Sequence, residues 1–211
     1  MEKVEKTKKI IFATGNLGKM KEVQAIFQDF TGEILSMKEA GIVCDIEENG
    51  ATFEENALIK ARAIHAHTDA LVLADDSGLE IDYLDKAPGV KSARFMGEDT
   101  SYHVKNAALI QKLEGVPKEK RTARFVCAIA AVLPDGTEKV LRRTIEGYIG
   151  YEECGENGFG YDPIFVVPEY GKTTAQLSME EKNEISHRGK ALKAMKDELR
   201  DFLDKEAEGS I

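Results

Sequence analysis

The stretch IIFATGNLGKMKEVQAIF (Ile10–Phe27) decides how the chain begins to fold. An apolar run over Lys9–Ala13 predicts a buried strand, and apolar residues at helical spacing predict a helix from about Gly18. The tight loop between them contains glycine, asparagine and lysine. We expect this loop to present free backbone N–H groups and the positive end of the helix dipole, both of which suit an anion.

The loop differs from the P-loop pattern G-x-x-x-x-G-K-[ST]. Gly15, Gly18 and Lys19 stand too close together, and Met20 replaces the hydroxyl residue. Two interpretations therefore stay open for the loop on its own: an anion site, or a tight turn beside a solvated Lys19.

The composition fits one folded unit. Of the 211 residues, 42% are apolar, which is enough for a substantial core without disulfides or metals. We expect a single bilobed domain over residues 1–211, with residues 1–8 as a flexible N-terminal extension. The net charge of -9 disfavours a general nucleic-acid binder, because such proteins usually carry a basic stripe.

The cysteines and the start of the chain indicate a location. Cys44, Cys127 and Cys154 are an odd number without metal-type spacing, as expected for a reduced intracellular protein. No apolar run is long enough to span a bilayer, and the charged start MEKVEKTKK lacks the apolar stretch of a signal peptide. We expect a cytoplasmic protein without a membrane partner.

Helix and strand patterns alternate along the rest of the chain. Thr52 and Glu55 fit a capping box that opens a helix. Leu71–Ala74 predicts a strand, and Asp75–Gly78 is expected to form an acidic turn before a second strand that begins at Leu79. The further predicted elements are a helix over Thr100–Glu114, strands over Arg121–Leu133 and Glu138–Ile149, an irregular segment over Gly150–Tyr161, and a last helix with Leu192, Met195, Leu199 and Phe202 on one face.

Two pairs of acidic residues could bind a cation. Asp75 and Asp76 follow an apolar strand, where adjacent carboxylates are costly unless a cation or a hydrogen-bond donor compensates them. Glu47 and Glu48 form a second pair in a predicted loop. Mg²⁺ is usually bound by one or two carboxylates, with phosphate oxygens and waters completing its shell. A plain Asp-Ser-Gly turn and a solvated Glu-Glu loop are the alternative interpretations.

Two later segments could contact a nucleobase or a phosphate. Phe159–Asp162 offers aromatic rings and a carboxylate, and Ser186–Gly189 offers an imidazole and a guanidinium. The alternatives are aromatic side chains packed in the core and basic side chains in solvent. His65, His67 and His103 form no convincing metal group, so we expect them to be surface or structural residues.

Several segments taken together resemble one enzyme family. TGNLGK, TFEENALIKARA, LADDSGLEID, APGVKSARFMG, GFGYDPIF and EKNEISHRGKAL resemble, in order and spacing, the inosine triphosphate pyrophosphatase family, which hydrolyses non-standard purine nucleoside triphosphates such as ITP, dITP and XTP. The resemblance covers about Lys9 to Leu203. It implies an α/β fold with a long twisted mixed β-sheet flanked by helices, two lobes around a central nucleotide-binding cleft, and usually a homodimer.

The resemblance also implies a reaction and roles for individual residues. The reaction is Mg²⁺-dependent cleavage between the α and β phosphates, which yields a nucleoside monophosphate and pyrophosphate. Asp76 would be the catalytic acid-base group and a metal ligand, and Glu47 is preferred to Glu48 as the second ligand. The residues implied to bind substrate are Thr14, Gly15, Asn16, Leu17, Gly18, Lys19, Lys60, Ser77, Phe159, Gly160, Tyr161, Asp162, Lys182, His187 and Arg188.

Two other functions fit part of the same sequence. One is a pyrophosphatase for modified pyrimidine triphosphates, and the other is a catalytically silent nucleotide-binding or regulatory protein. The pairing of FGYDP with SHRG argues against the first, and the presence of Asp76 and Glu47 beside Lys19 argues against the second.

Overall fold

The computed structural model describes residues 8–208, with side chains described to residue 204. The predicted N-terminal extension over residues 1–8 therefore lies outside the described residues, except for Lys8. The chain forms two compact units. Unit 1 comprises the described residues of Met1–Asp76, Ala128–Arg142 and Ala191–Ile211, and unit 2 comprises Ser77–Cys127 and Arg143–Lys190. That the chain acts as a single domain stays a prediction.

The described strands belong to one mixed sheet. Strand β1 pairs in parallel with β2 and β3, whereas β6 pairs antiparallel with β5 and β7. The strands, in the spatial order β2-β1-β3-β4-β5-β6-β7, are β1 (Lys9–Phe12), β2 (Glu33–Ser36), β3 (Leu71–Ile81), β4 (Thr122–Val132), β5 (Glu138–Ile149), β6 (Phe165–Val167) and β7 (Lys172–Thr173). Parallel neighbours require a crossover connection, which explains why helices separate β1 from β2 and β2 from β3.

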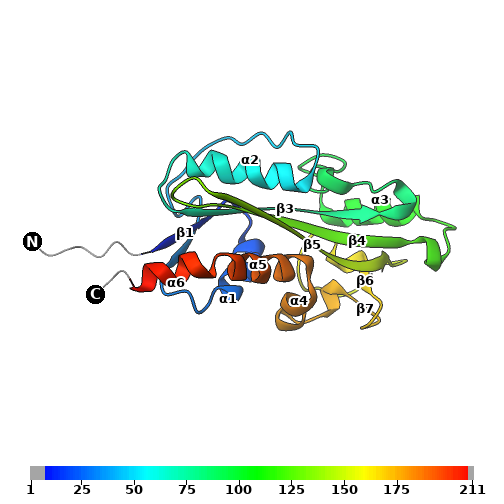
Figure 1. Ribbon diagram of the computed structural model, residues 1–211. Helices are drawn as coiled ribbons and strands as arrows, with labels where there is room; N and C mark the ends of the chain where they lie inside the picture. The colour runs from blue at the N-terminus through cyan, green and yellow to red at the C-terminus, as the bar shows by residue number, and fades with distance from the viewer. Residues whose placement is uncertain (1–7, 209–211) are drawn as a thin grey trace, which may run out of the picture. The chain divides into compact units, whose positions relative to one another are not determined.

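Unit 1 packs helices on both faces of its part of the sheet. Figure 1 shows α2 (Phe53–His65) along one face of β1 and β3, and α1 (Leu17–Ile26) and α6 (Arg200–Glu208) on the other. Strands covered on both faces are expected to be continuously apolar, and residues 10–13 and 71–74 are buried. Helix α2 begins as predicted, because the Thr52 hydroxyl accepts a hydrogen bond from Glu55 N over 3.1 Å.

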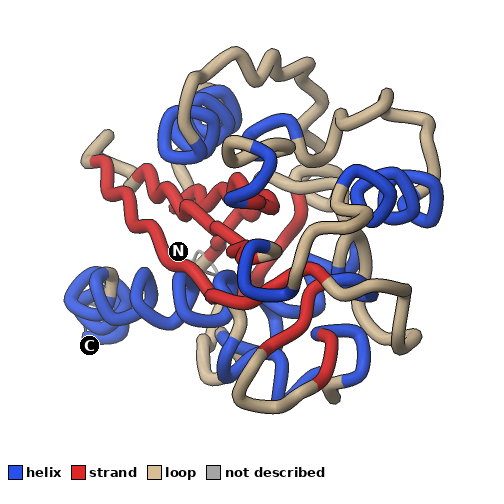
Figure 2. Tube along the Cα trace, turned by 90° about the vertical axis from the view of Figure 1, so that its right-hand side faces the viewer, coloured by secondary structure: helices blue, strands red, loops and turns tan. Residues whose placement is uncertain are grey.

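Unit 2 has its own apolar core, to which Leu79, Leu109, Phe125, Ile149 and Phe165 belong. The helices of this unit are α3 (Tyr102–Lys112), α4 (Met179–Ile185) and the beginning of α5 (His187–Glu198), which ends in unit 1. Figure 2 shows the helices and strands of the described residues along the Cα trace. Short 3₁₀ helices are η1 (Asp82–Leu84), η2 (Gly89–Lys91), η3 (Lys118–Lys120), η4 (Asp162–Ile164) and η5 (Thr174–Gln176). No helix in the described part of the chain is long and apolar enough to cross a membrane.

The structure corrects two predicted elements and adds four. The expected acidic turn at Asp75–Gly78 is wrong, because these residues lie inside the continuous strand β3. The last helix is divided at Leu199 into α5 and α6, although hydrogen bonds from Leu199 N to Met195 O and from Leu203 N to Leu199 O bridge the junction. Four elements have no counterpart in the sequence prediction: strands β2, β6 and β7 and helix α4. The other predicted helices and strands are confirmed, with end points shifted by one to a few residues.

Candidate functional site

The loop between β1 and α1 is held by its own side chains. Asn16 caps α1, since its Oδ1 accepts hydrogen bonds from Gly18 N at 2.8 Å and Lys19 N at 3.2 Å. The Thr14 hydroxyl accepts a hydrogen bond from Asn16 N at 3.1 Å. The expectation of free amides is therefore wrong for residues 16, 18 and 19. The amides of Gly15 and Leu17 are the donors of this loop that neither Thr14 nor Asn16 uses.

Lys19 projects from the first turn of α1 toward strand β3. Its Nζ lies 2.8 Å from Asp75 Oδ2 and 3.0 Å from Asp75 Oδ1. Asp75 is only 1% exposed. An ionised carboxylate at such a position requires a partner, and Lys19 supplies one. The alternative interpretation of Lys19 as a merely solvated side chain is therefore wrong.

Helix α2 and strand β3 together surround the carboxylate of Asp76. Asn56 Nδ2 donates to Asp76 Oδ2 at 3.2 Å, and Lys60 Nζ lies 3.4 Å from Asp76 Oδ1. Lys60 Nζ also lies 2.8 Å from Glu48 Oε2. Asn56 and Lys60 are four residues apart in the helix, which places both side chains on one face. One ammonium group is therefore shared by two carboxylates.

The environment shifts the pKa values of both charged groups. Burial raises the pKa of Asp76, and the carboxylates of Glu48 and Asp75 add to this increase, while Lys60 and Asn56 oppose it. Burial lowers the pKa of Lys60, but the carboxylates of Asp76, Asp75 and Glu48 outweigh burial and raise it. Lys60 therefore stays charged, and the Asp76 carboxyl binds a proton more readily than an exposed aspartate.

A cavity of about 260 Å³ opens beside these groups in unit 1. Its charged lining comes from Lys19, Glu48, Lys60 and Asp75. The remaining lining residues are Ala13, Thr14, Gly15, Met37, Cys44 and Ile46. The cavity thus joins the loop after β1 to the acidic pair of β3 and to the loop that carries Glu48.

The structure distinguishes the two glutamates, of which the family resemblance favoured Glu47. Glu48 is half-buried and bonded to Lys60, whereas Glu47 is exposed. Ser77 is half-buried in β3 directly after Asp76. Among residues 8–204 there is no group of three or more His, Cys, Asp or Glu side chains arranged to hold a metal ion. A metal bound here would therefore take few protein ligands.

A second group of predicted site residues lies in unit 2. Lys182 Nζ is 2.8 Å from Asp162 Oδ2, and both side chains are almost fully buried. Asp162 also accepts hydrogen bonds from Phe159 N at 2.8 Å and from the Thr174 hydroxyl at 2.8 Å. The half-buried Phe159 ring has Lys182 Nζ 4.9 Å and the Arg188 guanidinium carbon 5.5 Å from its centroid. Two cations therefore lie against one aromatic ring.

Other predicted site residues of unit 2 make contacts that stabilise the fold. Tyr161 is buried in the core of unit 2, where its hydroxyl donates to Ser92 O at 2.7 Å. The buried His187 ring stacks on Phe125 with 4.9 Å between centroids. Gly160 lies between Phe159 and Tyr161 with a φ of +69°, a conformation that favours glycine. For Tyr161, the alternative of core packing describes the contacts that the structure shows.

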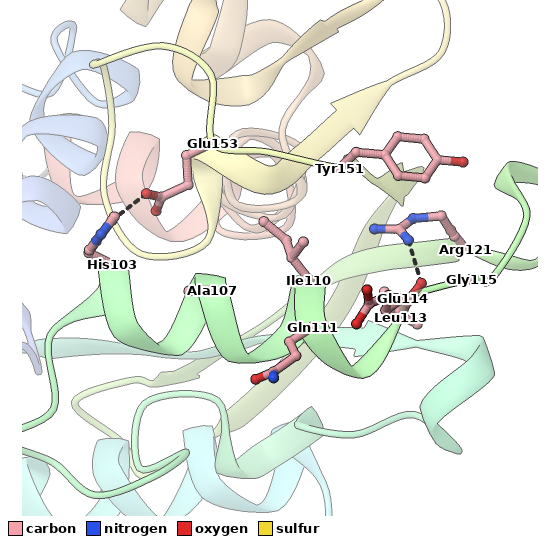
Figure 3. Close-up of a pocket in the computed structure, with 10 residues that line it drawn as sticks. All are labelled: His103, Ala107, Ile110, Gln111, Leu113, Glu114, Gly115, Arg121, Tyr151 and Glu153. Atoms are coloured by element: carbon pink, nitrogen blue, oxygen red, sulfur yellow. Dashed lines mark hydrogen bonds and ion pairs between the residues drawn. The ribbon is translucent and has the colours of Figure 1, made fainter.

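A second cavity, and the residues His65, His67 and His103, are not part of these groups. His67 and His103 are exposed and His65 is partly buried, in accord with a surface or structural role. A cavity of about 560 Å³ in unit 2 is lined by His103, Arg121 and Tyr151 among others (Figure 3). None of its lining residues belongs to the predicted site. The chemistry of the side chains, rather than cavity size, indicates the functional site.

The similarity to known proteins extends over both groups of predicted site residues. A family model described as the Ham1 family matches residues 10–198. The chain belongs to the Ham1 family. This match extends from β1 to the end of α5 and confirms the family inferred from the six motifs.

Similar Ham1 proteins support the same assignment. A dITP/XTP pyrophosphatase of Exiguobacterium sibiricum is 49% identical over 195 residues, which cover 92% of this chain and 98% of that protein. The Staphylococcus aureus Ham1 structure is 42% identical with a TM-score of 0.82, covering 92% of this chain and 98% of that one. A HAM1 protein from Coxiella burnetii is 40% identical with a TM-score of 0.83, covering 92% and 99%. The predicted α/β fold with a mixed sheet flanked by helices is confirmed.

Sequence reasoning did not identify two polar residues of these groups. Asn56 bonds to Asp76, and Thr174 bonds to Asp162. A signal existed for Asn56, because it precedes Lys60 by four residues in the same predicted helix. Thr174 follows Asp162 by twelve residues, and no local pattern of the sequence connects the two.

Proposed function

We propose that this Ham1 protein hydrolyses ITP, dITP and XTP to the nucleoside monophosphate and pyrophosphate. The observation that carries the proposal is the cavity of unit 1, which is lined by Lys19, Lys60, Glu48 and Asp75. Lys60 Nζ connects this lining with the carboxylate of Asp76, 3.4 Å away. Relatives named dITP/XTP pyrophosphatases, 44% to 51% identical to the chain, support it. This activity removes non-standard purine nucleotides from the nucleotide pool.

The lysines and the loop amides bind the triphosphate. A nucleoside triphosphate carries about four negative charges, so it requires positive groups in a partly desolvated site. Lys19, Lys60 and the amides of Gly15 and Leu17 supply them from α1, α2 and the loop between β1 and α1. The same groups neutralise the charge that gathers on the leaving pyrophosphate as the bond breaks.

Asp76 orients and deprotonates the attacking water. Burial raises the pKa of Asp76, so its carboxylate is a stronger base than an exposed aspartate. Asn56 and Lys60 each hold one of its oxygens. The water oxygen bonds to the α-phosphorus as its proton passes to this carboxylate. The bond from the α-phosphorus to the bridging oxygen breaks, and its electron pair leaves with pyrophosphate.

The oxygen ligands at this site fit Mg²⁺. Glu48 and Asp76 share the single ammonium of Lys60, so a divalent cation would relieve the repulsion between them. Mg²⁺ binds hard oxygen ligands, usually one or two carboxylates with phosphate oxygens and waters, which matches a site without a larger cluster of ligands. When bound, Mg²⁺ supplies polarisation of a phosphoryl oxygen and a lower pKa of a coordinated water. We assign its ligands to Asp76 and to Glu48 in preference to Glu47.

The residues of unit 2 bind the nucleoside. Phe159 offers an aromatic face, and Lys182 and Arg188 lie against its ring. The 6-carbonyl oxygen of hypoxanthine or xanthine accepts a hydrogen bond from a cationic donor, whereas the 6-amino group of adenine does not. Arg188 is the donor that we assign to this oxygen. His187, Gly160, Tyr161 and Asp162 shape the pocket through their packing and hydrogen bonds.

A panel of nucleotides tests the proposal. The protein is incubated with Mg²⁺ and ITP, dITP, XTP, ATP, GTP and modified pyrimidine triphosphates, and both products are identified. The expected result is monophosphate plus pyrophosphate from the first three and little product from ATP or GTP. Turnover restricted to the pyrimidines would support the first rival function, and nucleotide binding without turnover would support the silent one.

Two further expectations belong to this proposal. The family resemblance supports a homodimer, which sedimentation of the purified protein tests. Free Cys44, Cys127 and Cys154 support a reducing cytoplasmic location, which microscopy of the tagged protein in its host tests.

A further inference from the structure

Asn56 is a fully buried amide that bonds in two directions. Its side chain has no exposed surface, and it lies in the first turns of α2. Its Nδ2 donates to Asp76 Oδ2 at 3.2 Å, and its Oδ1 accepts from Gly50 N at 2.8 Å. The two bonds connect strand β3 with the loop that carries Glu48, so one side chain joins both acidic segments of the site.

The loop approaches the helix closely at the point of this contact. A Cβ atom at Gly50 would lie 2.7 Å from Asn56 Oδ1 and 2.8 Å from Glu55 Cβ. Glycine therefore allows the backbone to reach the amide oxygen of Asn56. The approach is specific to this position and places Glu48 two residues away from the anchored amide.

The start of α2 does not require Asn56. The Thr52 hydroxyl already accepts from Glu55 N, and Glu55 Oε2 accepts from Ala51 N at 2.6 Å. These two bonds cap the helix. Asn56 instead directs both of its polar atoms away from its own helix, which a residue that only stabilises the helix would not need.

Lys60 and Asn56 contact different atoms of the two acidic segments. Lys60 contacts Glu48 Oε2 and Asp76 Oδ1, whereas Asn56 contacts Asp76 Oδ2 and the loop backbone at Gly50. A lysine that faces a triphosphate is drawn toward the substrate, but a neutral amide keeps its bonds when charges change nearby. Asn56 is therefore the contact that can preserve the geometry of both segments.

We propose that Asn56 is a positioning residue that holds the Asp76 carboxylate and the Glu48 loop in one fixed geometry for the reaction. The inference rests on the proposed function for its kinetic consequence and on the two hydrogen bonds for its structural one. In this role Asn56 acts through Asp76 and the backbone at Gly50, not on the substrate itself. Loss of such a supporting contact typically lowers activity by about 10- to 100-fold.

The test compares Asn56→Ala and Asn56→Asp with the control Thr52→Ala, which removes a cap of the same helix. Both Asn56 variants should lower kcat for ITP by about 10- to 100-fold, while Thr52→Ala lowers Tm and changes kcat less than about twofold. In an Asp76→Asn background, Asn56→Ala should add less than about twofold, because it acts through the same group. If Asn56→Ala lowers kcat by the same factor in the wild type and in the Asp76→Asn variant, the proposal is overturned.

Hydrogen exchange at the Gly50 amide provides a readout that does not depend on activity. Asn56→Ala removes the acceptor and should speed exchange of this amide about tenfold or more, whereas Asn56→Asp keeps an acceptor oxygen and should preserve the protection. Unchanged exchange in Asn56→Ala would contradict the anchoring of the loop. If the wild-type protein hydrolyses none of the nucleotides, the proposed function fails, and this exchange measurement alone decides the positioning role. If Asn56→Ala does not fold, the nearly isosteric Asn56→Asp carries the kinetic test.

Discussion

Lys19 Nζ lies 2.8 Å from Asp75 Oδ2, and this contact joins the first turn of α1 to the middle of β3. Asp75 is only 1% exposed, whereas the Lys19 side chain retains 19% of its exposure. The lysine can therefore face a bound phosphate while it neutralises a buried carboxylate. We therefore expect Lys19 to contribute both to phosphate binding and to the stability of the fold.

The Lys19–Asp75 contact predicts a stability effect. Lys19→Met should lower the free energy of unfolding by about 2–3 kcal/mol, because Asp75 stays buried without the lysine cation. The double variant Lys19→Met/Asp75→Asn should recover most of that loss. Chemical denaturation measures both, and Lys21→Met, an exposed lysine of the same helix, is the control. A double variant less stable than Lys19→Met would contradict the coupling.

Asp76→Asn should abolish catalysis without unfolding the protein. We expect kcat for ITP to fall roughly 100-fold or more, the scale of a lost general base. Because burial already raises the pKa of Asp76, the neutral amide removes a desolvated charge, and Tm should not decrease. Steady-state kinetics and calorimetry measure the two effects. A folded variant with near wild-type turnover would show that Asp76 is only structural.

The two glutamates of the loop should respond differently to substitution. Glu48→Gln should raise the Mg²⁺ concentration needed for half-maximal activity by about tenfold or more, because its carboxylate lies beside Lys60 and Asp76. The exposed Glu47→Gln is the matched control and should change this value less than about twofold.

A chelator should abolish turnover in the wild type, and added Mg²⁺ should restore it. Full turnover in excess chelator would exclude the metal.

Arg188→Ala should change substrate preference as well as rate. Arg188→Ala leaves the 6-carbonyl oxygen of ITP without its charged donor, a loss of about 1–3 kcal/mol, so kcat/KM for ITP should fall roughly tenfold to over a hundredfold. The value for ATP should change much less, and the ratio between the two should narrow. The exposed Arg143→Ala serves as the control. Equal losses for both substrates would assign Arg188 to phosphate binding or structure. GTP shares the 6-carbonyl oxygen, so its rejection must depend on the 2-amino group and the shape of the pocket.

The pKa of Asp82 predicts a pH dependence of stability. Burial raises the pKa of Asp82, but hydrogen bonds from Lys86, Thr122 and Arg124 outweigh burial and lower the pKa from 3.8 to about 2. The stabilisation is therefore complete above about pH 4 and is lost as the pH falls toward 2. Asp82→Asn should lower Tm by about 2–4 °C at neutral pH, since the partly exposed contacts stabilise by about 1 kcal/mol. Thermal melts from pH 7 to pH 2 measure this difference, and a difference that stays constant with pH would contradict the assignment.

Local sequence patterns were sufficient to predict most helices and strands and to identify the family. Apolar periodicity marked β1, α1, β4 and β5, because alternating or helical spacing of apolar side chains specifies which face is buried. The order of six motifs specified the family without any long-range information. Asp76, Lys60 and the segment around Phe159 were predicted as site residues for the same reason, since each lies within a recognisable motif.

Only the tertiary structure decided how these residues bond to one another. The sequence predicted a turn at Asp75–Gly78 because adjacent acids disfavour a buried strand. Lys19 lies 56 residues away from Asp75, and Asn56 lies 20 residues away from Asp76, yet both donate to these carboxylates and allow β3 to continue. The choice of Glu48 as the partner of Lys60 has the same origin. Local pattern specifies which segments are buried, but the neutralisation of a buried charge depends on partners that only folding brings within hydrogen-bond distance.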